Sequence, residues 1–197
     1  MPKKGPKPEM QVASVGSTAG FAMVSGQATL SLHGPLPPNH PLYVRIGRVA
    51  SEWAHIEHIL DLIIWKLADI HDKQGACITS QILGVNPRCK AIATLGAGRL
   101  SPNLLKKFRT LASDSFVVSD LRARILHDPW YIEQVSGKTC QFKAMPASDP
   151  RYGIQDVDES EIDKTITKIK ALQERASSLH GNVLVELEPS WKKPDEG

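Results

Sequence analysis

Arg122 and His127, five positions apart, are the residues of this chain whose types and spacing best suit catalysis. They lie in the stretch DLRARILHDPWYI, residues 120–132, directly before an Asp-Pro pair that should end a helix. Metal-free RNA cleavage needs a base for the 2′-hydroxyl proton, a cation for the pentavalent phosphorane and an acid for the leaving oxygen. Histidine transfers protons near neutral pH, and arginine binds phosphate through two parallel hydrogen bonds, so the pair could supply these roles.

A purely structural role explains the same two residues. Arg122 could form an ion pair with an acid such as Asp120 or Glu57, and a histidine at a helix C-terminus interacts favourably with the helix dipole. Residue types and spacing alone favour this structural role. Glu57 and a second carboxylate, Asp61, flank the apolar seam of an earlier helix, where they could pair with the arginine or shift the pKa of the histidine.

Helical projection separates the arginine from the histidine. Five positions of an ideal helix turn by about 140°. Arg122 is therefore expected at the edge of the buried face and His127 on the opposite side, and that face is predicted to consist of Val117, Val118, Leu121 and Ile125. Convergence requires a distorted last turn or a second chain. Arg124 is closer to His127 by projection and is an alternative phosphate ligand.

No metal ion or other cofactor is expected. His55, His58 and Asp61 are spaced three apart on one predicted helix, but both histidines point away from the apolar seam and are expected at the surface. The cysteines include no CxxC pair, which argues against a zinc site or a disulfide framework; they are Cys77, Cys89 and Cys140.

Composition is that of a globular protein of moderate size. The chain has 197 residues, of which 41% are hydrophobic and 23% charged, and its net charge is +3. This mild basicity permits an RNA or nucleotide partner without requiring one. The longest apolar run, ILDLIIW at 59–65, is too short to span a bilayer, and no signal peptide is evident. We expect a soluble cytoplasmic protein with no membrane contact.

The chain begins with a Gly- and Pro-rich segment and continues into a long helix. Residues 1–38 are predicted to form a flexible arm with at most a short strand at 26–32. A helix follows, with Asn39 as its cap and Pro41 in its first turn. Its apolar seam steps alternately by four and three: Leu42, Ile46, Val49, Trp53, Ile56, Leu60, Ile63 and Leu67. Further apolar residues around its second half indicate contact with a partner chain.

Later elements follow from local start and stop signals. Four helices are predicted: residues 73–84 ended by Gly84, one starting at Asn86-Pro87, one starting at Ser101-Pro102, and one capped by Ser113 or Asp114 and stopped before Pro129. Alternating residues 130–144 predict a β-hairpin around SGK, with Trp130 as a core or hairpin anchor. A last long helix is predicted with Asp158 or Ser160 as its cap and Gly181 just past its end.

These elements define one mostly α domain. It is predicted as an up-and-down helical bundle over 39–130, followed by one small β-hairpin and a long C-terminal helix over 131–188, packed on the same domain. A solvated tail over 189–197 completes the chain.

The motif and its setting resemble one known superfamily. The R-x4-H pattern of Arg122 and His127, a long first helix reading SEWAHIEHILDLIIWKL, and a Pro-Trp after the motif resemble the HEPN superfamily (higher eukaryotes and prokaryotes nucleotide-binding domain) over roughly residues 41–130. The resemblance implies a dimerising bundle of four to five helices. It also implies, for active members, a metal-independent endoribonuclease, often a toxin or defence effector, with one composite cleft from two protomers.

Two functions therefore stay open. The first is a homodimeric, toxin- or defence-type endoribonuclease that uses His127 for proton transfer and Arg122 or Arg124 on the phosphate, with RNA as substrate and an antitoxin protein as a candidate partner. The second is a catalytically silent module of the same fold that binds a nucleotide or a protein. The retained Arg–His pair favours the first, and Ala123, where the family usually carries a polar residue, favours the second.

Overall fold

The computed structural model describes residues 33–145 and 151–188. These residues form five helices and four strands. The helices are α1 (Leu42–Ala68), α2 (Asp72–Thr79), α3 (Val85–Leu95), α4 (Pro102–His127) and α5 (Ser160–Leu187), and the strands are β1 (His33–Pro35), β2 (Trp130–Glu133), β3 (Thr139–Met145) and β4 (Arg151–Asp156).

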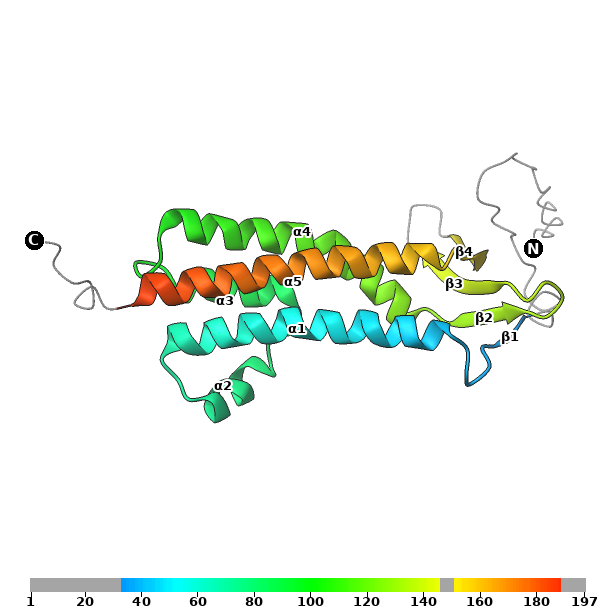
Figure 1. The fold of residues 1–197 in the computed structure, drawn as a ribbon, viewed down its shortest axis with the longest axis horizontal. Coiled ribbons are helices and arrows are strands. Elements are labelled where there is room, and N and C mark those ends of the chain that lie inside the picture. Colours follow the sequence, from blue (N-terminus) through cyan, green and yellow to red (C-terminus); the bar gives the residue numbers. More distant parts are fainter. Residues whose placement is uncertain (1–32, 146–150, 189–197) are drawn as a thin grey trace, which may run out of the picture.

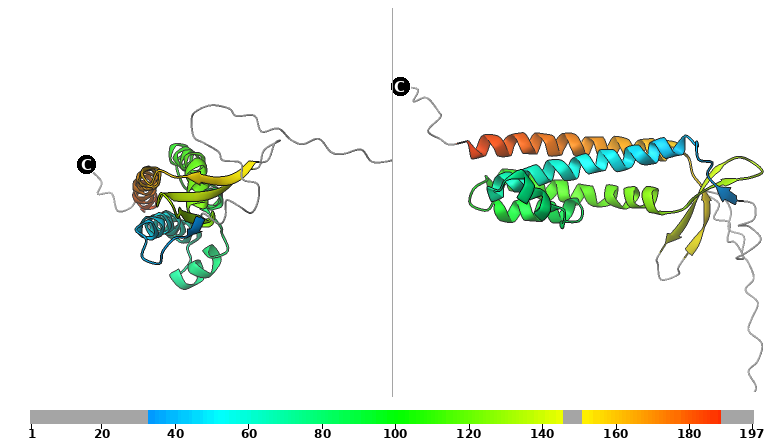
Figure 2. Two further views of the ribbon diagram at one scale, coloured as in Figure 1. Left: turned by 90° about the vertical axis from the view of Figure 1, so that its right-hand side faces the viewer. Right: turned by 90° about the horizontal axis from the view of Figure 1, so that it is seen from below.

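The described part of the chain is a mostly helical bundle with a small sheet at one end (Figure 1). Helices α1 and α5 run in the same direction, and α4 runs against them. Helix α3 packs against α1 and α4, while α2 lies at the side of α1. The sheet is placed where α4 ends and where α1 and α5 begin (Figure 2). No helix in the described ranges has both the length and the apolarity needed to cross a membrane.

The predicted seam of the first helix is confirmed. Seven of its eight positions are buried in α1, and Ile46 packs against the core as a partly buried residue. The start of the helix differs from the prediction, because the free backbone N–H of Leu42 donates to His40 Nδ1 at 3.2 Å and not to Asn39. The helix ends at Asp69, whose left-handed backbone (φ 54°) lets its N–H bond to the Trp65 carbonyl.

Helix α4 is one continuous helix, so the predicted break at Ser113 or Asp114 is wrong. Its start is as predicted, since the Ser101 side chain accepts from the Leu104 N–H and Pro102 occupies the first turn. Asp114 lies in the middle of the helix and forms an ion pair with Arg175 of α5, with 2.7 Å between Asp114 Oδ2 and Arg175 Nη1. No glycine or proline interrupts residues 103–128, and a cap-type residue alone does not end a helix whose other residues are packed.

The sequence predicts that one helix ends at Gly84 and that the last helix ends just before Gly181, and both predictions are wrong. Helix α2 stops at Thr79, and Gly84, with φ 86°, directly precedes α3. Helix α5 continues through Gly181 to Leu187 because the apolar spacing continues as well: Val183 is fully buried in the core. At the start of α5, Asp158 accepts hydrogen bonds from the Ser160 N–H and hydroxyl at 2.9 and 2.6 Å.

The predicted hairpin is present as β2 and β3, within a larger sheet. All three strand pairs are antiparallel, in the order β1-β2-β3-β4. Strand β1 lies in the predicted arm, which therefore ends before residue 38. Strand β4 lies between the predicted hairpin and the predicted last helix, where the sequence analysis predicts no strand. The strand predicted at 26–32 lies outside the described residues. Leu36 after β1 joins the single hydrophobic cluster that α1, α3, α4 and α5 share.

Gly75 allows α2 to pack closely on α1. A Cβ atom at this buried glycine would lie 2.5 Å from Cγ of the Trp65 indole. We expect Gly75→Ala to lower the free energy of unfolding by about 1–3 kcal/mol, because the rigid ring has to move. Gly181→Ala is the matched control: it lies within α5 with nothing within 4 Å of its Cβ position, so it should raise stability by about 0.5–1 kcal/mol. Urea unfolding measures both, and a stabilising Gly75→Ala would contradict this packing.

Candidate functional site

Arg122 lies on the core-facing side of α4 and is half-buried. The buried positions of this helix step by four and three, and Arg122 continues that series between Val118 and Ile125: Leu104, Phe108, Leu111, Ser115, Val118 and Ile125. Helical projection predicts Val117 on the buried face of this helix, and that prediction is wrong, because Val117 is 63% exposed. The Arg122 Nε is buried and has no hydrogen-bond partner. A buried donor left unpaired costs about 1–3 kcal/mol, so this arginine is poorly explained by packing.

His127 is the last residue of α4 and is exposed. The next residue, Asp128, ends the helix through its N–H, which donates to the Arg124 carbonyl at 3.1 Å. Its side-chain Oδ2, however, is buried without a partner. Across the described residues, Arg122 Nε and Asp128 Oδ2 are the two buried side-chain polar atoms in this condition, and they flank His127 in sequence.

Arg122 and His127 do not converge within one chain. Helix α4 stays α-helical through His127, so the two side chains diverge by about 140° as in an ideal helix. Accordingly, one is half-buried and the other exposed. The first of the two conditions set by the sequence, a distorted last turn, is therefore not met.

The predicted supporting carboxylates have other partners. Asp61 accepts from Arg88 Nε at 2.7 Å, and Glu57 lies 3.8 Å from Arg88 Nη1. Glu57 also accepts from the Trp53 indole N–H at 3.0 Å. Arg88, whose side chain is only 8% exposed, thus ties α3 to α1. Among the described residues, no hydrogen bond or ion pair joins Glu57 or Asp61 to Arg122 or Arg124.

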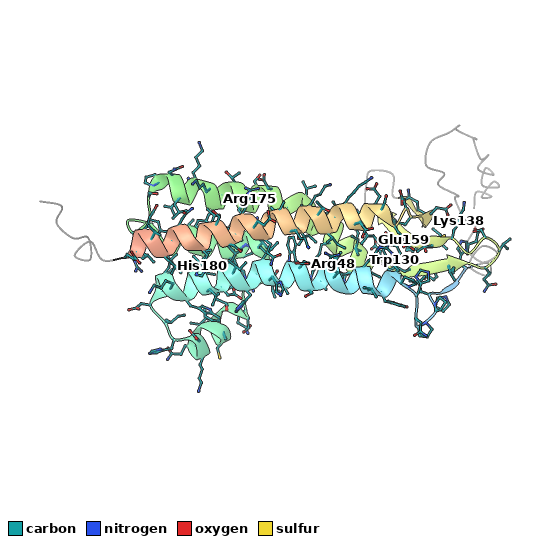
Figure 3. All side chains as sticks on the ribbon, in the orientation of Figure 1. Arg48, Trp130, Lys138, Glu159, Arg175 and His180 are labelled. Carbon is teal, nitrogen blue, oxygen red and sulfur yellow. The ribbon has the colours of Figure 1, made fainter. Side chains whose placement is uncertain are left out.

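Arg124 and the end of α4 are held by neighbours on both sides. Asp120 lies 3.4 Å from Arg124 in an exposed pair one helical turn away. The Trp130 indole N–H donates to the Ile125 carbonyl at 2.9 Å, and buried Gln141 donates to the Arg124 carbonyl at 2.9 Å. Trp130 lies where the bundle meets the sheet (Figure 3), so its predicted role as an anchor is confirmed. These two bonds fix the helix end that carries His127.

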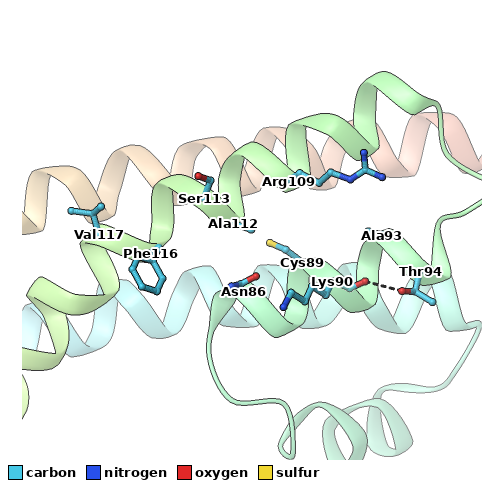
Figure 4. Close-up of a pocket in the computed structure, with 10 residues that line it drawn as sticks. All are labelled: Asn86, Cys89, Lys90, Ala93, Thr94, Arg109, Ala112, Ser113, Phe116 and Val117. Carbon is cyan, nitrogen blue, oxygen red and sulfur yellow. Dashed lines mark hydrogen bonds between the residues drawn. The ribbon is translucent and has the colours of Figure 1, made fainter.

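A groove between α3 and α4 lies on the exposed side of α4 (Figure 4). Its volume is about 820 Å³, and it is lined by Asn86, Cys89, Lys90, Ala93, Thr94, Arg109, Ala112, Ser113, Phe116 and Val117. Phe116 and Val117 are 70% and 63% exposed, large values for apolar side chains. By helical projection Phe116 and His127 lie within about 20° of each other, so they share one face of α4.

The described residues contain no metal-ligand cluster, and two of the three cysteines are poor nucleophiles. No three His, Cys, Asp or Glu side chains in this part of the chain are arranged to hold a metal ion. Burial raises the pKa of the Cys89 thiol to about 12, and burial together with Asp156 raises that of Cys140 to about 11. Both thiols stay protonated near neutral pH and are poor nucleophiles.

Comparisons with known proteins return no match: no protein-family model, no curated protein and no solved structure is similar to this chain. The functional assignment therefore depends on the residues of the site itself.

Proposed function

We propose that this protein is a metal-independent endoribonuclease of the toxin or defence type, with Arg122 and His127 at a composite site formed by two copies of the chain. The observation that supports it most is that Arg122 Nε and Asp128 Oδ2, from residues that precede and follow His127 in the sequence, are buried and have no hydrogen-bond partner. Such uncompensated groups are rare in native proteins and call for an explanation, of which a catalytic role is one.

The chemistry follows from the two residue types. One histidine takes the proton of the RNA 2′-hydroxyl, and the freed O2′ attacks the adjacent phosphorus. Arginine stabilises the extra negative charge of the phosphorane through paired hydrogen bonds. The P–O5′ bond then breaks, and the protonated histidine returns its proton to O5′. The products are a 2′,3′-cyclic phosphate and a 5′-hydroxyl end.

Homodimerisation supplies the geometry that one chain lacks. The exposed face of α4 carries Phe116 and His127 together, and an exposed apolar pair beside a groove is typical of a protein contact surface. A two-fold contact on this face would bring two copies of α4 and their His127 side chains together. Arg122 lies about 140° away on its own helix, so composite catalysis also requires the RNA to reach it at the edge of this contact.

Cleavage of mixed RNA in EDTA tests the proposed activity. We expect chelator-resistant cleavage with cyclic phosphate and 5′-hydroxyl ends, and none of DNA of the same sequence, which lacks the 2′-hydroxyl nucleophile. Cleavage that stops in EDTA, or that also destroys the DNA, would contradict the proposed mechanism.

Val117→Asp is expected to dissociate the dimer and to abolish cleavage. The fold of each chain should be kept, because the Val117 side chain is already exposed. Two symmetry-related carboxylates in one contact repel each other, so the dimer Kd should rise at least about tenfold. The matched control is Val44→Asp in α1, where the valine is 76% exposed. Light scattering with both variants measures the effect, and a dimeric, active Val117→Asp protein would exclude this face.

The groove itself favours a second candidate, the catalytically silent module. Its volume is within the range of small-molecule sites, and Lys90 and Arg109 could contact the phosphates of a nucleotide. This candidate predicts no chelator-resistant cleavage, together with saturable ATP binding that Arg109→Ala weakens.

A further inference from the structure

A small basic pocket lies beside the Arg–His stretch, among the last turns of α4, strand β3 and the first turns of α5. Its volume is about 160 Å³. Four cationic side chains and one acidic side chain line it: Arg124, Lys143, Lys164, Lys168 and Glu161. The pocket is separate from the groove between α3 and α4, with which it shares no lining residue.

The positive charge of this pocket is only partly neutralised. Lys164 is paired with Glu161 at 2.6 Å, and Arg124 has only the exposed Asp120 at 3.4 Å. Within the described part of the chain, Lys143 and Lys168 form no ion pair. Burial lowers the pKa of the half-buried Lys143, the charge of Arg124 lowers it further, and Asp128 and Glu161 partly oppose this. Repulsion among these cations would be relieved by a bound anion.

The pocket has a fixed floor and an apolar wall. Gln141 is only 3% exposed, and its Nε2 holds the Arg124 carbonyl, so the backbone under the arginine is fixed. Apolar side chains complete the lining: Leu121, Ile125, Trp130, Val157 and Ile162. An ion bound against such a wall is less screened than one on an open surface, which strengthens its attraction to the cations.

We propose that this pocket binds a phosphate group, and that the group is a backbone phosphate of the RNA beside the scissile one. The choice of RNA as its source rests on the proposed ribonuclease function. The volume is below the roughly 300 Å³ of the smallest typical ligand sites, so it suits a small anion and not a base with its sugar. Its donors come from three elements and can surround a tetrahedral group. Arg124 is only three residues from His127, which places the pocket next to the reacting phosphate.

The test removes the two cations without an ion pair. Lys143→Gln/Lys168→Gln is made in a His127→Ala background, so that the RNA stays intact. Its control is Lys66→Gln/Lys73→Gln in the same background, which removes equal charge from exposed lysines of α1 and α2. A short fluorescein-labelled single-stranded RNA of mixed sequence reports binding by anisotropy in EDTA at several salt concentrations. Calorimetry with inorganic phosphate is the second arm.

We expect the pocket variant to bind this RNA at least about tenfold more weakly, since hydrogen bonds between charged groups are lost. Its slope of log affinity against log salt should be shallower by about 0.7, the value for one phosphate on a single strand. The control pair should change neither quantity, and inorganic phosphate should bind to the unaltered pocket and not to the pocket variant.

Each remaining outcome has one meaning. Unchanged RNA binding with loss of phosphate binding would keep the phosphate pocket and overturn RNA as its source. Unchanged binding of both, or no binding of either to any variant, would overturn the pocket. RNA binding through the pocket by a protein that never cleaves RNA would overturn the ribonuclease and leave the pocket standing, whereas cleavage with an unaffected pocket variant would do the reverse.

Discussion

His127→Ala is expected to lower the rate of RNA cleavage in EDTA by about 100- to 10,000-fold, the usual contribution of a positioned proton-transfer group. The fold should not change, because His127 is exposed and is the last residue of α4. Cleavage rates measured at equal protein concentration, with circular dichroism and light scattering on the same samples, separate loss of catalysis from loss of structure.

His55→Ala is the control for this variant. His55 is an exposed histidine of α1, and its Nδ1 lies 3.4 Å from Nε2 of Gln173. It should cleave at the rate of the unaltered protein. Full cleavage by His127→Ala would show that another group transfers the proton and that His127 has only a structural role at the helix end.

Arg122→Met is expected to stabilise the protein and to inactivate it. Methionine fills a long core-facing position without a buried unpaired donor, so the free energy of unfolding should rise by about 1–2 kcal/mol. Loss of the phosphate ligand should lower cleavage by about 100-fold or more. Opposite effects on stability and activity are the pattern of a residue kept for function. Urea unfolding and cleavage assays on the same preparation measure both.

Arg88→Met is the contrast that makes this result specific. Arg88 is more deeply buried than the half-buried Arg122, and its guanidinium is paired with Asp61 at 2.7 Å. Removing it leaves a mostly buried carboxylate unpaired and should cost about 3 kcal/mol. If Arg122→Met were destabilising to a similar degree, Arg122 would be a structural residue like Arg88, and the assignment of the site would fail.

Local sequence signals predicted the elements whose ends and faces depend on neighbours in the chain. The apolar seam of α1, the Ser101-Pro102 start of α4 and the β2–β3 hairpin are of this kind. The signals failed where contacts distant in sequence decide the outcome. A helix cap is predicted at Ser113 or Asp114, yet Asp114 pairs with Arg175 from α5. A helix end is predicted at Gly181, yet the packing of Val183 continues the helix.

In the candidate site, too, local signals were sufficient for some residues, and contacts distant in sequence decided the others. The stretch with Arg122 and His127 was recognisable from residue types, but the core-facing position of Arg122 appears only once α4 is known to be continuous. No local sequence signal identifies Arg88 as the partner of Glu57 and Asp61, because Arg88 and Asp61 are 27 residues apart in the sequence. Lys143 and Lys168 likewise come together only through the packing of the sheet on α5.

Complementation between two inactive chains tests the composite site most directly. Arg122→Met and His127→Ala chains, coexpressed with different tags, would form heterodimers in which one site has lost both residues and the other retains both. The account predicts that purified heterodimers cleave RNA in EDTA at about half the rate of the unaltered dimer, while each variant alone is inactive. Heterodimers as inactive as the parent variants would contradict a site built from the arginine of one chain and the histidine of its partner.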